Sequence, residues 1–139
     1  FGGRVKQFEQ RRPLIWKSFA RFAQEKGRKL LVRRYENYLR HPQEPDTLFY
    51  GGNQMIVVTS QRPIDGARAL ANLERMTHAM GLGALYCGFA AVAIEADQTL
   101  REYFGVTEER HLDGCLIVGH TPLRFQRTAP RNPARAVWR

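Results

Sequence analysis

Cysteine is scarce in this sequence of 139 residues. The two cysteines, Cys87 and Cys115, lie in apolar surroundings and do not have the spacing of a metal motif. Two isolated cysteines also cannot supply the ligands of an iron–sulfur cluster. We therefore expect both to be buried thiols of a cytoplasmic protein.

Long apolar runs are also absent from the sequence. No run approaches the roughly 20 residues needed to cross a bilayer. The first residues contain no apolar segment of the kind found in signal peptides. We therefore expect no membrane span.

Acidic residues are outnumbered by basic ones. Asp and Glu total 13 against 22 Lys and Arg, which gives a formal net charge of +9. Such a balance is compatible with a nucleic acid, an anionic membrane or a phosphate-bearing ligand, and equally with an arginine-rich surface of no specific role. The length and the 43% hydrophobic content fit one globular domain.

The stretch from residue 64 to residue 89 predicts a helix, a glycine turn and a short buried strand. Asp65 is expected to cap the start of the helix. Gly81 and Gly83 are expected to adopt positive φ and to lead into a strand over residues 84–89. The predicted buried stripe of the helix consists of Leu70, Leu73, Met76, Thr77 and Met80.

The rest of the chain predicts further alternation of helices and strands. Residues 1–12 are expected to be loosely held, and residues 13–39 to form two helices or one helix interrupted at Gly27. Strands are predicted over residues 53–60 and 111–120, and a helix over residues 95–104 that ends at Gly105. This order indicates an α+β fold in layers, with helices packed on a small mixed sheet. Residues 123–139 are expected to form an extended basic C-terminal arm.

Three segments resemble the C-terminal half of the flavin-dependent nitroreductase family. They are GLGALYCGFA (81–90), LREYFGVTEERHLDGCLIVGHT (100–121) and APRNP (129–133). The pattern L-R-x-x-x-G-(I/V/L)-P-E of that family is matched from Leu100 to Glu108, with Thr107 where proline is usual. The resemblance runs from about Asp46 to the end, and the basic phosphate-binding segment that opens the family's domain is not found before Pro13. We therefore expect the chain to be a single nitroreductase-like domain, residues 1–139, that is an incomplete, C-terminal part.

The resemblance implies a homodimer with flavin mononucleotide (FMN) at the subunit interface. Electrons would pass from NAD(P)H or a similar donor to a nitroaromatic, a quinone or a related acceptor. The family pattern brings the backbone of Cys87 and Gly88 close to the flavin ring, with Tyr86 adjoining it. It assigns Arg131 to the flavin phosphate and Arg127 as a helper, a role that suits the planar guanidinium fork.

Two other classes of function stay open at this stage. In a nucleic-acid-binding module, Arg21, Arg28, Arg33, Arg34 and the arginines of the arm would contact phosphates. The scattering of positive charge over all segments, with no recognisable reading motif, disfavours this class. A flavin-free interaction domain that keeps the fold is the other alternative, because fold alone does not fix function.

Overall fold

The structure, a computed structural model, describes residues 2–44, 47–52 and 54–122. Helices and strands alternate along it, as the sequence predicts for an α+β fold. In chain order they are α1 (Gly2–Glu25), α2 (Lys29–Arg40), β1 (Gln54–Ser60), α3 (Pro63–Ala79), β2 (Gly83–Tyr86), α4 (Gly88–Ala96), α5 (Gln98–Phe104) and β3 (His111–Gly119).

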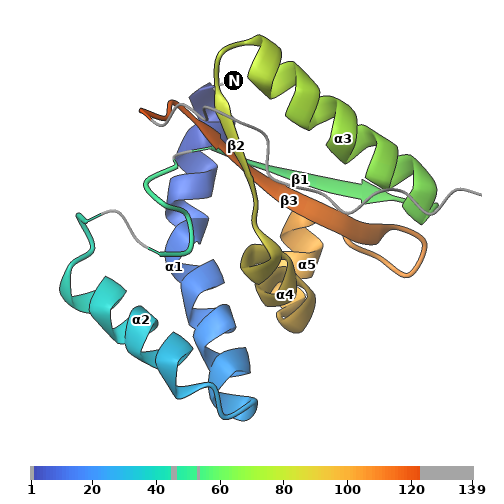
Figure 1. The fold of residues 1–139 in the computed structure, drawn as a ribbon. Coiled ribbons are helices and arrows are strands. Elements are labelled where there is room, and N and C mark those ends of the chain that lie inside the picture. The colour runs from blue at the N-terminus through green and yellow to red at the C-terminus, as the bar shows by residue number, and fades with distance from the viewer. Residues whose placement is uncertain (1, 45–46, 53, 123–139) are drawn as a thin grey trace, which may run out of the picture.

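Different helices cover the two faces of the sheet (Figure 1). On one face lies α3, whose Leu70 forms a small core with Leu116 and Val118 of β3. On the other face lie α1 and α4, and here the larger core includes Trp16, Ile94 and Ile117. The sheet is therefore a layer between two sets of helices, as expected from the alternation of helices and strands.

The central strand of the sheet is β3, in the order β1-β3-β2. It pairs antiparallel with β1 and antiparallel with β2. The prediction of a mixed sheet is thus wrong for the described residues. The strands β1 and β2 do run in the same direction, but they are not neighbours because β3 lies between them.

The first helix starts much earlier than the sequence suggests. Residues 1–12 were expected to be loosely held, whereas α1 is helical from Gly2 onward and continues through Pro13. Two basic side chains of this part contact aromatic rings: the guanidinium of Arg11 lies 4.5 Å from the ring centre of Tyr103, and that of Arg12 lies 5.1 Å from that of Phe49. These cation–π contacts come from distant parts of the chain, so local composition does not reveal them.

Gly27 separates α1 from α2, which confirms the alternative of two helices. Its φ of +65° is readily adopted only by glycine among common residues. The second helix packs on α1, where Tyr35 and Tyr38 stack on the indole of Trp16 at centroid distances of 6.1 Å and 5.2 Å. In Figure 1, α2 lies beside the end of α1, away from the sheet.

The start of α3 differs from the prediction. Asp65 is not the capping residue, because Arg62 occupies the N-cap position and Pro63 begins the helix. The carboxylate of Asp65 accepts a hydrogen bond from Nε of Arg62 at 2.7 Å. Asp65 therefore stabilises the first turn through an ion pair with the N-cap residue Arg62.

The predicted buried stripe of α3 is only partly buried. Leu70 and Thr77 are buried, and Leu73 packs against the smaller core. Met76 and Met80, by contrast, are 61% and 67% exposed. The periodicity identifies the apolar side of the helix correctly, but the sheet covers only part of that side.

Glycines end two helices as predicted, but Gly83 does not turn the chain. Gly81, after α3, and Gly105, after α5, have φ of +72° and +71°. Gly83 is the first residue of β2 and lies against Thr121, whose Cγ2 would be 2.8 Å from an added Cβ. The strand also ends at Tyr86, so Phe89 belongs to α4 and not to the predicted strand.

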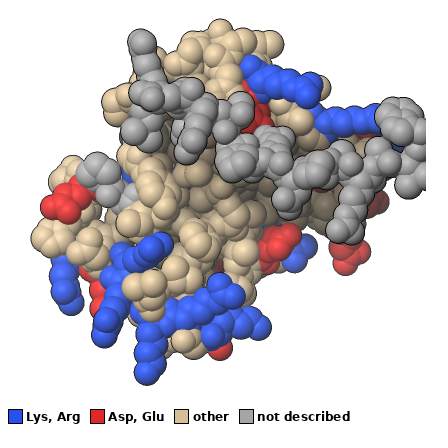
Figure 2. Space-filling model, viewed as in Figure 1, with Lys and Arg blue, Asp and Glu red and all other residues tan. Residues whose placement is uncertain are grey.

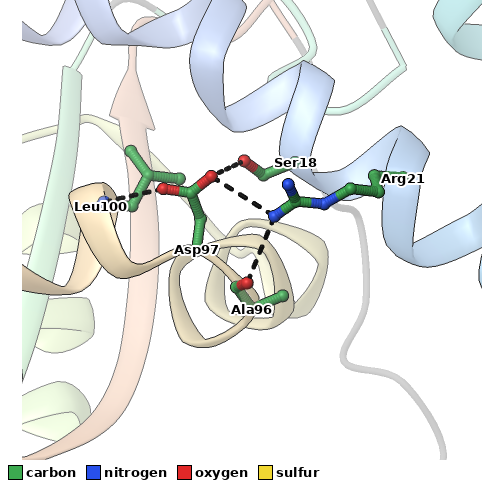
Figure 3. Close-up of polar contacts among 5 residues, drawn as sticks. All are labelled: Ser18, Arg21, Ala96, Asp97 and Leu100. Carbon is green, nitrogen blue, oxygen red and sulfur yellow. Dashed lines mark hydrogen bonds and ion pairs between the residues drawn. The ribbon is translucent and has the colours of Figure 1, made fainter.

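Asp97 divides the predicted helix over residues 95–104 into α4 and α5. Its Oδ1 accepts the backbone N–H of Leu100 at 3.2 Å and so caps α5. Its Oδ2 accepts a hydrogen bond from Oγ of buried Ser18 at 2.8 Å and lies 3.5 Å from Nη2 of Arg21 (Figure 3). Because Ser18 and Arg21 belong to α1, Asp97 joins three helices.

Candidate functional site

Strand β2 and helix α4 meet at Tyr86, Cys87 and Gly88, the three described residues that the sequence assigns to the cofactor. The strand β2 pairs with β3 along one edge and, within the described residues, has no strand on the other. The junction therefore lies at the margin of the sheet. Arg127 and Arg131, expected to bind the flavin phosphate, lie outside the described residues.

Cys87 fixes the junction to the rest of the molecule. Its backbone N–H donates to the carbonyl of Cys115 at 2.9 Å, and its own carbonyl accepts the N–H of Ala91 at 3.3 Å. Its Sγ lies 3.4 Å from the carbonyl oxygen of Leu48, and the residue is buried. The position of the next residue, Gly88, is consequently well defined.

Gly88 borders open space. Apart from its own chain neighbours, no atom of the described residues would lie within 4 Å of a Cβ added at this position, and the residue is exposed. It is the first residue of α4, and no side chain caps this end of the helix. A planar group can therefore approach the backbone here without obstruction from a side chain.

Large apolar side chains around Gly88 are exposed. Leu85, Tyr86 and Phe89 are 40%, 49% and 39% accessible, although the sequence predicts a buried strand here. The ring of Phe89 also contacts Phe19 of α1 at a centroid distance of 4.9 Å, so its orientation is partly fixed. Adjacent exposed apolar residues on a soluble domain are typical of ligand or subunit contacts.

The side chain of Tyr86 contacts α3. Its hydroxyl donates to Oε2 of Glu74 at 3.0 Å and lies 3.4 Å from the carbonyl oxygen of Leu70. Burial raises the pKa of Tyr86, and the hydrogen bond to Glu74 and its negative charge raise it further. The phenol therefore stays neutral and acts as a hydrogen-bond donor at neutral pH.

Sequence reasoning missed the partner of Tyr86 and the cap formed by Asp97. A tyrosine in an apolar strand generally needs a polar partner for its hydroxyl, which is the available signal for the contact with Glu74. An aspartate just before the first residues of a helical pattern, as Asp97 is before residues 98–104, is a usual signal of a helix cap. Neither signal indicates which distant helix is contacted.

Both thiols are expected to be unreactive in the folded protein at pH 8. Cys87 and Cys115 are 4% and 2% exposed, so a thiol reagent such as Ellman's should modify neither within minutes and both after denaturation. Rapid modification of native protein would contradict this, and Cys87→Ser and Cys115→Ser would identify the thiol.

Burial raises the pKa of the Cys115 thiol to about 12, with smaller contributions from Cys87 and Glu95. Because the unfolded state loses this proton first, the free energy of unfolding should fall as the pH rises from about 9 to about 12.

Two further properties concern only the residues that the structure describes. Among them, no group of three or more His, Cys, Asp or Glu side chains is arranged to hold a metal ion. None of the described helices has both the length and the apolar character needed to cross a membrane.

Comparison of the chain with protein-family models, with curated proteins and with solved structures gave no match. The chain is therefore assigned to no family on that basis.

Proposed function

We propose that this chain is part of an FMN-dependent oxidoreductase of the nitroreductase type. The observation that carries the proposal is the open backbone at Gly88, between the exposed side chains of Tyr86 and Phe89 at the margin of the sheet. Tyr86 and Gly88, with Cys87 between them, are residues that the sequence resemblance assigns to the flavin ring, and the structure adds Phe89 beside them. The fold of the described residues, helices on both faces of a small sheet, is compatible with that family but does not define it.

The residues of the junction fit the ring of a flavin. The isoalloxazine ring is flat and largely apolar, and it needs an apolar surface with no side chain projecting into it. Gly88 has no side chain that could obstruct the ring, while Tyr86 and Phe89 provide apolar surface beside it. Cys87 would contribute its backbone, which its bonds to Cys115 and Ala91 hold in place.

In this proposal the protein positions and orients the cofactor, and the flavin supplies the redox chemistry. When bound, FMN accepts a hydride from a donor such as NAD(P)H and passes electrons to a nitroaromatic, a quinone or a related acceptor. Arg131, with Arg127 as a helper, would hold the phosphate through charge-assisted hydrogen bonds. A second copy of the chain would cover the apolar residues around Gly88, since the proposed enzyme is a homodimer with FMN at the interface.

The test is retention of FMN by the full chain and by Gly88→Leu. Purified protein is mixed with FMN and desalted, and the flavin absorption that stays with the protein is measured. The wild type should retain flavin with shifted bands, whereas Gly88→Leu should bind it at least about tenfold more weakly, because a leucine side chain would occupy the open space.

A matched control separates this effect from unfolding. Because a Cβ at Gly88 would clash with no atom in the described part of the chain, Gly88→Leu should keep the wild-type free energy of unfolding to within about 1 kcal/mol. Gln24→Leu, an exposed position on α1, introduces the same side chain away from the junction and should retain FMN normally. A folded wild-type chain that stays colourless would overturn the proposal and favour a flavin-free interaction domain.

A further inference from the structure

The net positive charge is not scattered evenly over the segments, as the sequence suggested, but is concentrated on the hairpin formed by the end of α1 and by α2. Residues 17–40 contain eight Lys and Arg and two Glu, so this segment contributes six of the nine net positive charges of the chain. Figure 2 shows these blue side chains gathered over α2 and the end of α1, with few red ones among them. The basic residues are Lys17, Arg21, Lys26, Arg28, Lys29, Arg33, Arg34 and Arg40.

Nearly all of these charges lack an ion-pair partner among the residues that the structure describes. Within the described part of the chain, Arg21 is the only one of the eight that forms an ion pair, at 3.5 Å from Asp97. Arg34 is half-buried and the other seven basic residues are exposed. Exposed like charges this close together repel one another, so an anionic partner would be bound favourably here.

A groove runs along α2 at the centre of this surface. It has a volume of about 210 Å³, and Arg33 and Arg34 contribute two positive charges to its lining. The opposite charge in the groove is Glu44, which lies 3.8 Å from Nδ1 of His41. The groove can therefore accept one anionic group beside the two arginines.

The apolar side of α2 is already used for packing. Leu31, Tyr35 and Tyr38 pack against the larger core, and both tyrosine rings stack on Trp16. Of the remaining apolar residues of α2, Val32 is half-buried, and the exposed Leu30 and Leu39 are nine residues apart and so lie on opposite sides of the helix. Consequently α2 offers neither a continuous apolar face for insertion into a membrane nor free aromatic rings for stacking on bases.

We propose that this hairpin binds the phosphate backbone of nucleic acid without base specificity. A single small anion would neutralise only the two arginines of the groove, whereas the charges extend along both helices. The 12 residues of α2 alone span roughly 18 Å. Over that length a nucleic acid duplex presents on the order of ten phosphates, at about 1.7 Å of axis per charge. The proposal is independent of FMN binding.

The experiment measures binding of a fluorescein-labelled 20-base-pair DNA of mixed sequence, and of its single strand, by fluorescence anisotropy. If about three phosphates are neutralised, a rise from 50 to 200 mM KCl should weaken duplex binding roughly 40-fold, and log K should fall linearly with log[KCl]. Scrambling the DNA sequence should change the affinity less than about twofold, because only phosphates are contacted.

Two double variants with the same change in net charge locate the binding surface. Lys29→Gln with Arg33→Gln should weaken binding at least about tenfold and reduce the salt slope by about 2. Arg68→Gln with Arg75→Gln removes two exposed basic residues from α3 instead and should weaken binding less than about twofold. Equal losses in the two variants would show that only the net charge matters and would overturn the proposal.

Two further controls distinguish other partners. Stronger binding to phosphatidylserine vesicles than to DNA, with the same dependence on the hairpin residues, would assign the surface to membranes and overturn the proposal. Complete displacement of DNA by millimolar inorganic phosphate at constant ionic strength would indicate a site for small anions and would also overturn it. Neither outcome affects the flavin test, because that test depends on Gly88.

Discussion

Trp16→Ala is expected to lower the free energy of unfolding by about 3–5 kcal/mol, the usual cost of truncating a buried tryptophan. Trp16 is 1% exposed and belongs to the larger core. Its ring stacks on Tyr35 and Tyr38 of α2 and meets Phe19 edge-on at a centroid distance of 6.2 Å. Alanine would leave a cavity and would remove the contacts that hold α2 against α1. Urea denaturation followed by circular dichroism measures the change.

Trp16→Phe is the matched control for this prediction. Phenylalanine keeps an aromatic ring, and it also removes an indole N–H that is buried and finds no acceptor among the described residues. Loss of an unsatisfied donor offsets part of the lost packing, so we expect a cost below about 2 kcal/mol. A loss from Trp16→Ala no larger than that from Trp16→Phe would contradict the role of the ring in the core.

Asp97→Ala is expected to lower the free energy of unfolding by about 2–4 kcal/mol. The substitution removes the cap of α5, which is worth about 1 kcal/mol, and leaves the buried hydroxyl of Ser18 without its acceptor, which costs about 1–3 kcal/mol. It also removes the ion pair with Arg21, which contributes little because Arg21 is exposed. Urea titration of both proteins at pH 7 gives the difference.

The pH dependence tests whether the charge of Asp97 matters. Burial alone raises the pKa of Asp97, but the hydrogen bonds from Ser18 and from the backbone N–H groups of Leu100 and Thr99, with the charge of Arg21, outweigh burial and lower it. The ionised Asp97 carboxylate therefore contributes fully to the free energy of unfolding above the pKa of the unfolded state, near 3.8. This contribution is lost as the pH falls through the lower pKa of the folded state. The difference between wild type and Asp97→Ala should shrink in that range.

Two control variants accompany this prediction. Asp97→Asn keeps an oxygen to cap α5 but loses the charge, so its cost should lie between those of the wild type and Asp97→Ala. Gln98→Ala changes the neighbouring exposed residue and should cost less than about 0.5 kcal/mol. An Asp97→Ala protein as stable as Gln98→Ala would show that the polar contacts of Asp97 drawn in Figure 3 do not stabilise the fold.

Much of the fold follows from local signals in the sequence. The glycines at 81 and 105 follow helix ends as predicted, and Gly27 separates two helices, one of the two alternatives; each adopts a positive φ that other residues disfavour. The strand predicted over residues 111–120 is β3, since a short apolar run bounded by polar residues is covered on both faces. These features depend on neighbouring residues only, which is why the sequence alone suffices.

Other features depend on partners far along the chain. The helical start of α1 is accompanied by contacts of Arg11 and Arg12 with distant aromatic rings, and a composition-based argument misses both. The all-antiparallel pairing of the sheet arises because β3 lies between β1 and β2, an order that local sequence signals do not reveal. The exposure of Met76 and Met80 depends on where the sheet ends beneath α3.

The candidate site was predicted in part. The sequence resemblance selects Tyr86, Cys87 and Gly88, and the geometry adds that Gly88 borders open space and that Tyr86 bonds to Glu74. Burial of Leu85 was predicted incorrectly, because a strand at the margin of a sheet keeps its apolar side chains accessible. The assignment of Arg127 and Arg131 stays a prediction.

The central strand joins the two hydrophobic cores into one cooperative unit. Along β3, Cys115 and Ile117 point into the larger core, while Leu116 and Val118 point into the smaller core. Neither core can lose β3 without exposing apolar side chains of the other, so the two cores should unfold together. Among the described residues, none of α2 is buried, and this helix packs on α1 by stacking Tyr35 and Tyr38 on Trp16. Half of the basic residues of the hairpin, Lys29, Arg33, Arg34 and Arg40, thus lie on a helix that can open locally while the sheet stays folded.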